Sequence, residues 1–419
     1  MKKNKLVLLL IMISYFSFSQ TNVSGGIYSD TTWSPSGNPY IVTDNVVVFE
    51  DITLTIEPGV IIKFEYGLGI ELRGKLIAIG NATDTITFTS NLVSPVQSSW
   101  SGITVIGTIG IENGQVTMEY CNGEYAATFI DLNLAYNGPY IFRHCYFANN
   151  FRTNYDGGSP STLFENCTFE SNYLGLGYCQ FDSKVVNSSF INNVNGVEAI
   201  KIIDTCFFSG NTGVAVTPYG ATINCTIQNN YIGVKGLFNS SNNIFINNTL
   251  KNNSIGVEIE SYFNGFINFT GNTICNNTIY NIQLLGTNNA DLSNNCWCSS
   301  DSTYIRSTIY DGYLNTSYGL INFLPFTTNC HELEINEITE NNNSPALVFP
   351  NPFGNEIEII SVKNESTEIK IFDVSGRLII DNKFINSNII NTEVLPKGVY
   401  FYHLETEKGY YKKGKLVKR

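Results

Sequence analysis

The sequence predicts an all-β protein in which a parallel β-helix, a solenoid of stacked coils, is followed by a small antiparallel β-sandwich. Three observations favour this fold class. A short frame of Asn, Gly and apolar residues recurs along the middle of the chain. That region lacks the helical periodicity of apolar residues. After Cys330 the composition changes, and strand-like alternating segments replace the repeats.

The repeat sets the coil length. NSSFINNVNGV, NCTFESNYLGL and NNTLKNNSIGV share one frame. Successive frames start 23, 21, 17, 20, 23 and 24 residues apart, which indicates one coil of a solenoid per repeat. A conventional sandwich is the alternative. The frames begin at Arg143, Asn166, Asn187, Asp204, Asn224, Asn247 and Gly271.

Each coil is expected to hold two short strands between Asn and Gly corners. Asn tolerates the left-handed backbone of a corner, and its amide can bond to the same amide one coil away. Gly relieves the second corner. Two apolar positions per frame should point into the core. They are Tyr146, Phe169, Phe190, Phe207, Ile227, Leu250 and Ile274 at the first position, and Val197, Val214, Val234 and Val257 at the second.

Composition and charge narrow the function classes. Of the 419 residues only 14% are charged and 13% are aromatic, and the formal net charge is −12. This profile is typical of an extracellular β-rich protein, and no nucleic-acid partner is expected because phosphate binding takes clustered Lys and Arg. Residues 1–19 place lysines before a short apolar run and are predicted to be a signal peptide. No other stretch could cross a membrane.

Ten cysteines in an exported chain are compatible with disulfides. Their pairing stays open, and buried free thiols are expected as well. The CWC at Cys296–Cys298 leaves one residue between its thiols and has no second pair or His nearby, so no metal site is predicted. No cofactor is expected.

The chain divides into five segments. Residues 1–19 are the signal peptide, and residues 20–100 form the N-terminal cap and first coils. Residues 101–330 form the parallel β-helix with a C-terminal cap, in which Trp297 and the 323–326 stretch plug the last coil. Residues 331–345 are an acidic linker. Residues 346–419 form the β-sandwich, because segments such as EIEIIS and GVYFYHLE alternate apolar and polar residues.

The N-terminal motifs carry a family resemblance. EPGV, GKLIAIG and WSGI occur in this order between Trp33 and Ile103. With them the region resembles the secreted right-handed parallel β-helix proteins of Bacteroidetes. The far end departs from that pattern, because Cys296 and Cys298 flank Trp297 where the family has a glycine after an aromatic pair. The resemblance covers about 300 residues, implies a right-handed β-helix, and is nearly silent on activity.

The C-terminal motifs carry a second resemblance. VFPNPFGNEIEI, IKIFDVSGRLI and LPKGVYFYHLETEKGYYKKGKLVKR resemble the Ig-like C-terminal sorting domain of type IX secretion substrates. This implies handling by the type IX machinery, export through the periplasm to the outer cell surface or beyond, and release or attachment to surface lipopolysaccharide. An ordinary Ig-like module is the alternative. The matching residues are Pro350, Asn351, Pro352, Gly376, Arg377, Lys397, Gly398, Val399 and Tyr400.

Candidates for catalysis are few. The solenoid has no Asp-Asp pair, and the chain has no DxDxDG calcium loop. Repeat stacking predicts one outward column of Glu198, Ala215, Lys235 and Glu258, with Lys235 next to Glu258. An exposed salt-bridge ladder is the alternative to an active site. Further candidates in nearby coils are Asp182, Lys184 and Lys201, while His144, His331 and His403 are assigned structural positions.

Binding candidates form two sets. Tyrosines outside the core positions could contact glycans, since flat rings with a polar edge suit sugars, or they could cover loop bases. They are Tyr155, Tyr173, Tyr178, Tyr219 and Tyr231, with Phe151 beside them. A second, outward column could be a hydroxyl ladder or simply an exposed β surface. It is Cys145, Thr168, Ser189, Cys206, Thr226, Thr249 and Thr273.

The predicted function is therefore contact with extracellular polysaccharide or another surface. A noncatalytic, adhesin-like binding protein is favoured by the lack of an acid cluster. A polysaccharide lyase or glycoside hydrolase acting in a groove of the β-helix is the alternative. Fold class alone does not choose between them.

Overall fold

The structure is a computed structural model, and the part it describes is mostly β-strand. Two compact units are distinguished, an N-terminal unit within residues 1–183, 188–199 and 211–213, and a C-terminal unit within 184–187, 200–210 and 214–419. The described residues are 20–107, 114–134, 138–156, 161–177, 182–236, 243–260, 268–328, 330, 346–349, 353–361, 366–373, 377–385, 387–407 and 411–418.

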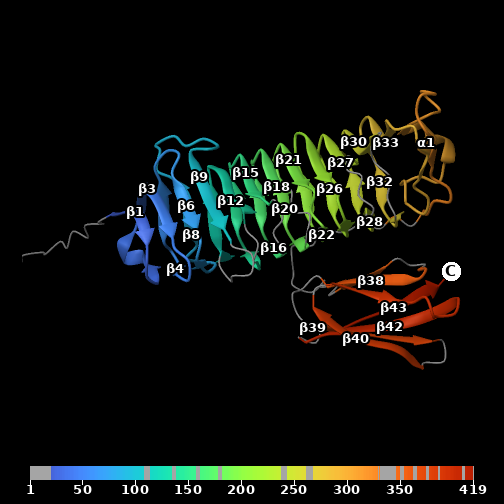
Figure 1. The fold of residues 1–419 in the computed structure, drawn as a ribbon. Coiled ribbons are helices and arrows are strands. Elements are labelled where there is room, and N and C mark those ends of the chain that lie inside the picture. Colours follow the sequence, from blue (N-terminus) through green and yellow to red (C-terminus); the bar gives the residue numbers. More distant parts are fainter. Residues whose placement is uncertain are drawn as a thin grey trace, which may run out of the picture. The chain divides into compact units, whose positions relative to one another are not determined.

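In the N-terminal unit, every coil adds parallel strands to the coil before it (Figure 1). Two strand positions of the coil, which we call the first and second limbs, belong to a 23-stranded sheet. A third strand position, which we call the third face, belongs to an 11-stranded sheet. The first limb holds β1 Thr21–Ile27, β3 Tyr40–Val48, β5 Ile61–Phe64, β8 Ile86–Ser90, β11 Cys121–Glu124, β14 Tyr146–Ala148, β17 Thr168–Glu170 and β20 Ser189–Ile191. The second limb holds β6 Gly69–Leu72, β9 Trp100–Ile106, β12 Ala126–Leu134, β15 Arg152–Tyr155, β18 Leu174–Gly177 and β21 Asn195–Glu198. The third face holds β2 Thr31–Trp33, β4 Thr53–Ile56, β7 Lys75–Ile79, β10 Gln115–Glu119, β13 Tyr140–Arg143 and β16 Ser161–Glu165, and η1 spans Pro35–Gly37.

The C-terminal unit has coils of the same plan. Its first limb holds β23 Phe207–Ser209, β26 Thr226–Gln228, β29 Thr249–Lys251 and β32 Thr273–Cys275. The second limb holds β24 Val214–Thr217, β27 Ile232–Gly236, β30 Ile255–Ile259, β33 Tyr280–Leu284 and β35 Ile309–Tyr310. The third face holds β19 Asp182–Val186, whose first two residues belong to the N-terminal unit, and β22 Ile202–Asp204, β25 Ala221–Ile223, β28 Ile244–Ile246 and β31 Asn268–Thr270.

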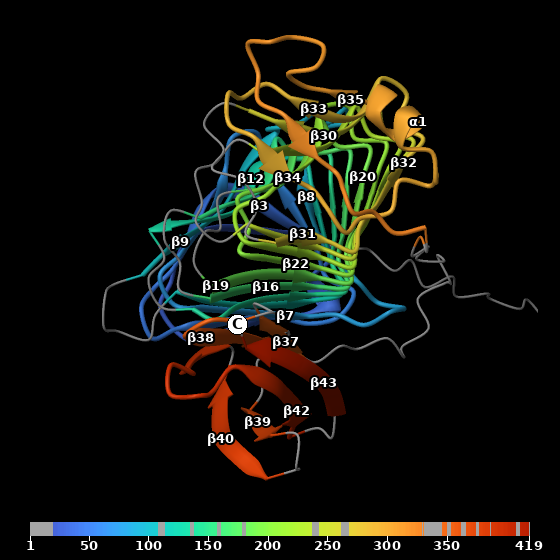
Figure 2. The ribbon, with the colours of Figure 1, turned by 90° about the vertical axis from the view of Figure 1, so that its right-hand side faces the viewer.

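Each full coil thus has three strands, where two were predicted (Figure 2). The third strand escaped the sequence pattern because its residues lie outside the recurring frame. After the last coils come α1 Ser302–Ser307 and the pair β34 Ala290–Asp291 and β36 Ile321–Asn322. No helix in the described part of the chain has the length and apolarity that a membrane crossing takes.

The core is a stack of apolar side chains. Phe147, Phe169 and Phe190 are fully buried, and successive ring centres lie 5.4 and 4.5 Å apart. The predicted inward positions are confirmed at Phe169 and Phe190 but wrong at three others. Val214 is half-buried, and Val216 takes the inward place beside Val234. Phe147, not Tyr146, pairs with Phe169, and Phe208, not Phe207, pairs with Ile227.

The same one-residue shift corrects the outward column. Tyr146 stands beside Thr168, and Phe207 stands beside Thr226, so the column holds two aromatic rings in place of cysteines. Cys145 and Cys206 are buried, with 2% of each exposed. Thr249 and Thr273 are buried as well. A regular, exposed hydroxyl ladder is therefore absent from these described positions.

The C-terminal cap confirms part of the predicted plug. Trp297 is fully buried, and its ring meets Phe323 edge-on at 6.1 Å. Both cysteines that flank Trp297 are in disulfides, Cys275–Cys298 and Cys296–Cys330. The CWC stretch therefore fastens the last coils, which is the use that the sequence left open.

Two antiparallel sheets make up the C-terminal strands. A three-stranded sheet and a four-stranded sheet share one apolar core, which includes Ile357, Ile371, Tyr402 and Leu404. This is the β-sandwich that the alternating sequence predicts. Its strands are β37 Ala346–Phe349, β38 Glu356–Ser361 and β41 Ser387–Asn391 in one sheet, and β40 Leu378–Ile385, β39 Ser366–Asp373, β42 Gly398–Thr406 and β43 Tyr411–Lys418 in the other.

Candidate functional site

A buried ladder of Asn amides fixes one corner of the coils in the N-terminal unit. The Nδ2 of Asn150 donates to Oδ1 of Asn172 at 3.1 Å, Asn172 to Asn193 at 3.1 Å, and Asn193 to Asn211 at 3.2 Å. Each ladder Asn directly follows a residue with left-handed φ, such as Ser171 at 55°. The predicted amide ladder is thus confirmed, but the left-handed corner falls on the residue before each ladder Asn, where the prediction gave both roles to one Asn.

The C-terminal unit has its own amide ladder. The Nδ2 of Asn230 donates to Oδ1 of Asn253 at 2.9 Å, and Asn253 donates to Asn277 at 3.1 Å. The preceding residues, Asn229 and Asn252, have φ of 58° and 57°. In both ladders, the residue that follows each ladder Asn lies at the surface of the corner.

That following residue defines a row that we call the corner ridge. It combines aromatic, aliphatic and hydroxyl side chains. Among them Phe151 is 37% exposed, Tyr173 is 44% exposed and Tyr231 is 53% exposed. Three of the aromatic residues singled out in the sequence therefore occupy one repeat position. The ridge is Phe151, Tyr173, Val194 and Thr212 in the N-terminal unit, and Tyr231, Ser254 and Thr278 in the C-terminal unit.

The rings of Phe151 and Tyr173 stack on each other. Their centres are 4.9 Å apart and their planes differ by 7°. The guanidinium of Arg152 lies 5.3 Å from the Phe151 ring centre and 5.1 Å from that of Tyr155. The stacking covers one face of each of these two rings.

Tyr231 is placed differently. Its coil neighbour at the same ridge position is Ser254, whose N–H donates to the carbonyl of Asn230. No ring in the described residues stacks on Tyr231, and its small neighbour leaves room beside the phenol. A flat, exposed ring of this kind suits the apolar face of a sugar.

The remaining tyrosine candidates do not join the ridge. Tyr155 is half-buried at the end of β15, next to Arg152. Tyr219 is half-buried between β24 and β25. Tyr178 lies outside the described residues. Of the tyrosines predicted to contact glycans, Tyr173 and Tyr231 thus lie on the corner ridge, whereas Tyr155 and Tyr219 do not.

The predicted neighbours Lys235 and Glu258 are paired in adjacent strands, as expected. The Nζ of Lys235 lies 2.8 Å from an oxygen of Glu258 and 2.7 Å from one of Glu260. The sequence missed Glu260 because it lies outside the repeat frame. Ala215 was wrong, since Val216 pairs with Val234 and the next residue, Thr217, therefore matches Lys235.

The other catalytic candidates are not drawn into this group by any contact between described side chains. Glu198 accepts a hydrogen bond from the amide of Asn195 at 3.2 Å. Lys201 is half-buried just before β22. Asp182 begins β19, where the description covers its backbone alone.

The electrostatics of Lys235 oppose a role as catalytic base. Burial alone would lower its pKa, but hydrogen bonds and charge from Glu258 and Glu260 raise the pKa of Lys235 above its ordinary value. A base must release its proton at working pH, and this ammonium is held charged between two carboxylates. The group is a partly buried ion-pair network.

Lys235→Met should lower the free energy of unfolding by about 1–2 kcal/mol at pH 7, between the values for exposed and buried pairs. Because the folded-state pKa is raised, the stabilisation is fully present below the unfolded Lys pKa of about 10.4 and is lost as pH rises through the folded-state value. Urea unfolding from pH 7 to 11 checks this. A difference in unfolding free energy between the wild type and Lys235→Met that widens above pH 10 would contradict the prediction. Lys75→Met is the control, since Lys75 has no ion pair among the described residues.

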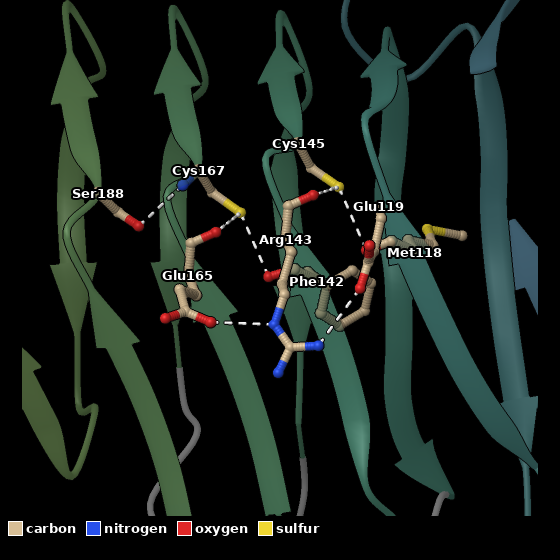
Figure 3. A network of polar contacts seen from close by, with 8 residues as sticks. All are labelled: Met118, Glu119, Phe142, Arg143, Cys145, Glu165, Cys167 and Ser188. Atoms are coloured by element: carbon tan, nitrogen blue, oxygen red, sulfur yellow. Dashed lines mark hydrogen bonds and ion pairs between the residues drawn. The ribbon is translucent and has the colours of Figure 1, made fainter. Parts of the chain in front are cut away.

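The outer third face carries a charge ladder that repeat reasoning missed (Figure 3). Arg143 lies between Glu119 and Glu165, with nitrogen–oxygen distances of 3.3 and 2.9 Å. Burial works against its charge, but the two carboxylates raise the pKa of Arg143. The strand register Glu119–Arg143–Glu165 accounts for the contacts, so a structural role suffices.

Tyr146 is another group of this region whose pKa is shifted. Its hydroxyl donates to Glu170 at 2.8 Å. Burial, followed by the hydrogen bond and charge of Glu170, raises the pKa of Tyr146 to about 12. The phenol is thus neutral at physiological pH and acts as a donor.

The histidines occupy the structural positions expected of them where they are described. His144 takes a left-handed corner with φ 52°, and its ring stacks on Tyr120 at 4.6 Å. His403 packs beside Phe372 in β42. His331 lies outside the described residues. No group of three or more metal-ligating side chains occurs among the residues that were described.

In the C-terminal sandwich, the described part of the sorting motif divides into buried and exposed residues. Tyr400 is 5% exposed, and its hydroxyl donates to the carbonyl of Pro396 at 2.7 Å. Arg377 pairs with Asp373 at 3.1 Å while most of its side chain stays exposed. Lys397 and Gly398 are exposed. The candidates Pro350, Asn351, Pro352 and Gly376 lie outside the described residues.

Lys418 is a feature of the sandwich that sequence reasoning missed. Its side chain is buried, and its Nζ donates to the carbonyls of Thr392 and, at 3.3 Å, Glu393. It also lies 6.0 Å from the Phe353 ring centre. One of the basic residues near the chain end therefore stabilises the module from within.

Two single-protein comparisons cover short stretches. Residues of this chain are 40% identical over 75 positions to Protein bark beetle of Drosophila melanogaster, which is 18% of this chain and 2% of that protein's length. A solved structure of a DUF3244 family protein with an immunoglobulin-like β-sandwich fold from Bacteroides vulgatus is 16% identical. It covers 18% of this chain and 84% of that chain, with a TM-score of 0.17.

Family models match both parts of the fold. Residues 25–133 match the pectate-lyase like beta helix domain, and residues 347–419 match the secretion system C-terminal sorting domain. The first match lies on the parallel coils and the second on the antiparallel sandwich. The chain carries a pectate-lyase-like β-helix domain followed by a type IX secretion sorting domain, which implies export to the cell surface or beyond.

Proposed function

We propose that the β-helix is a noncatalytic recognition scaffold that binds extracellular polysaccharide or a similar surface. The observation that carries the proposal is the corner ridge, where the repeat places exposed aromatic side chains at one position of the coil. Tyr231 offers a ring that no described ring covers. Ring faces, ring edges and neighbouring hydroxyls are the groups with which proteins hold sugars.

The route to the site of action is part of the same proposal. Residues 1–19 act as a signal peptide, and the chain passes the periplasm of a Bacteroidetes bacterium before the sorting domain directs it outward. The mature protein is then released or attached to surface lipopolysaccharide. The acidic composition, with a formal charge of −12, favours neutral polymers as ligands over strongly anionic ones.

A polysaccharide lyase or hydrolase is the second candidate, favoured by the match of residues 25–133 to the pectate-lyase like model. Lys235, which lies between the carboxylates of Glu258 and Glu260, is unsuited to act as base because its pKa is raised. The full chain should be incubated with a panel of acidic and neutral polysaccharides while binding, new reducing ends and unsaturated-uronate absorbance are followed. Binding without product supports the proposal, whereas product from any polymer overturns it.

Tyr231→Ala should weaken binding to any polysaccharide of the panel that the full chain binds. The expected loss is about tenfold, which corresponds to about 1.4 kcal/mol. The loss follows from removing the ring that contacts the sugar face. The matched control is Tyr66→Ala, since Tyr66 is 73% exposed but lies outside the ridge. Equal affinities of the two variants, measured by isothermal titration calorimetry, would remove Tyr231 from the site.

A further inference from the structure

Cysteines outside the disulfides stand in line within the N-terminal unit. Cys121, Cys145 and Cys167 are free thiols, and at most 2% of each is exposed. The strand register places them in successive coils, because Asn122 pairs with Tyr146 and Tyr146 pairs with Thr168. The next coil has Ser188 here, whose Oγ accepts from the N–H of Cys167 at 3.0 Å.

The three thiols have equivalent surroundings. Each Sγ lies within hydrogen-bonding distance of two carbonyls, one from the residue two positions before it and one from the preceding coil. The latter contacts are 3.4 Å to Ala78, 3.6 Å to Met118 and 3.5 Å to Phe142. Figure 3 shows these contacts for Cys145 and Cys167. Equivalent contacts in successive coils space the sulfurs by about one coil rise, ~4.8 Å.

This spacing has a chemical meaning. A monovalent d¹⁰ ion held linearly between two thiolates needs sulfurs about 4.6 Å apart, twice a metal–sulfur bond of about 2.3 Å. Soft thiolate ligands in a dry setting select such ions over hard cations. A tetrahedral ion such as Zn²⁺ would need four ligands, which a single line of sulfurs does not provide.

A second pair stands in the C-terminal unit. Cys206 and Cys225 occupy adjacent coils, and the N–H of Cys206 lies 3.4 Å from Sγ of Cys225. Both sulfurs repeat the contact pattern, with 3.3 Å to Asp204 and 3.2 Å to Ile223. Both residues are at least 98% buried.

We propose that these stacked thiols are binding sites for a monovalent thiophilic ion of the Cu⁺ and Ag⁺ class, held linearly between sulfurs of adjacent coils. Two thiols lose their protons to bases of the solvent as one ion enters. Cys145 is shared by both pairs of the three-thiol line, so that line takes one ion. The chain therefore takes two ions, one in each unit.

The test uses the full chain in a Cys179→Ser background, with both disulfides intact and the other thiols unoxidised. The chain is incubated with Ag⁺ in an ammonia buffer and weighed by native mass spectrometry. Two ions per chain are expected. Cys145→Ser should take one, since it interrupts the line, while Cys121→Ser should still take two, since Cys145 and Cys167 remain. Cys225→Ser should take one. Zn²⁺ at the same concentration should leave the mass unchanged.

If Cys145→Ser does not fold, the double variant Cys121→Ser/Cys167→Ser replaces it and should also take one ion. Undiminished binding by Cys145→Ser or by the double variant would overturn the proposal. A mass of the Cys179→Ser chain two hydrogens below that expected with its two cap disulfides would reveal a further disulfide among the stacked thiols and would overturn the proposal too. So would a chain that binds no Ag⁺ at all.

Discussion

Asn172→Ala is expected to lower the free energy of unfolding of the N-terminal unit by about 3 kcal/mol or more. The change leaves buried polar groups without hydrogen-bond partners, at a cost of about 1–3 kcal/mol each. The Oδ1 of Asn172 accepts from the N–H of Asn150 at 2.9 Å, and its Nδ2 donates to the carbonyl of Phe147 at 2.9 Å. Neither partner can reach water through the closed corner. Thermal unfolding followed by circular dichroism measures the effect.

The matched control is Val194→Ala, an exposed ridge residue for which a change within about 0.5 kcal/mol is expected. Asn172→Asp adds a second comparison, since it keeps the acceptor but places a charge in the buried ladder. That variant should be more stable at low pH than at neutral pH, because protonation removes the charge. A loss below about 1 kcal/mol for Asn172→Ala would show that the ladder is not a main source of stability.

The repeat predicted the Asn corner because Asn suits the local backbone there. Its glycines were wrongly placed at a second corner, since Gly233 and Gly256 lie within strands β27 and β30 and do not have a left-handed φ. It misplaced Tyr146 and Phe207 because CYF and CFF each offer two aromatic residues in succession. The left-handed residue is the better anchor of the frame, since His144 and Thr205, with φ of 52° and 53°, directly precede the buried thiols. Aligning on that residue gives the observed strand register.

The candidate site was less accessible to sequence reasoning. The pairing of Lys235 with Glu258 follows from repeat stacking, and the structure agrees. That Phe151 and Tyr173 cover each other's faces, while Tyr231 has a small neighbour, depends on side-chain packing between coils. The frame reveals which position is repeated but not how neighbouring rings lie on it.

Deletion of residues 346–419 is expected to abolish surface display of the chain. The sorting domain is expected to carry the export address, and its apolar core, which includes Ile357 and Leu404, contains no residue of the β-helix. The deleted chain should accumulate in the periplasm as a folded, protease-resistant β-helix. Cell fractionation and protease accessibility on whole cells measure this. Display equal to that of the full chain would refute the sorting role.

Point variants separate recognition of the sorting domain from its folding. Lys418→Ala removes a buried ammonium that donates to two carbonyls, so it should lower both the melting temperature of the sandwich and the amount displayed. Arg377→Ala changes a side chain that is 76% exposed and should leave the melting temperature nearly unchanged. If Arg377 belongs to the surface that the secretion machinery reads, display falls without unfolding. Normal display of the Arg377 variant beside a defect in the Lys418 variant would mean that the stability of the sandwich, not this arginine, governs export.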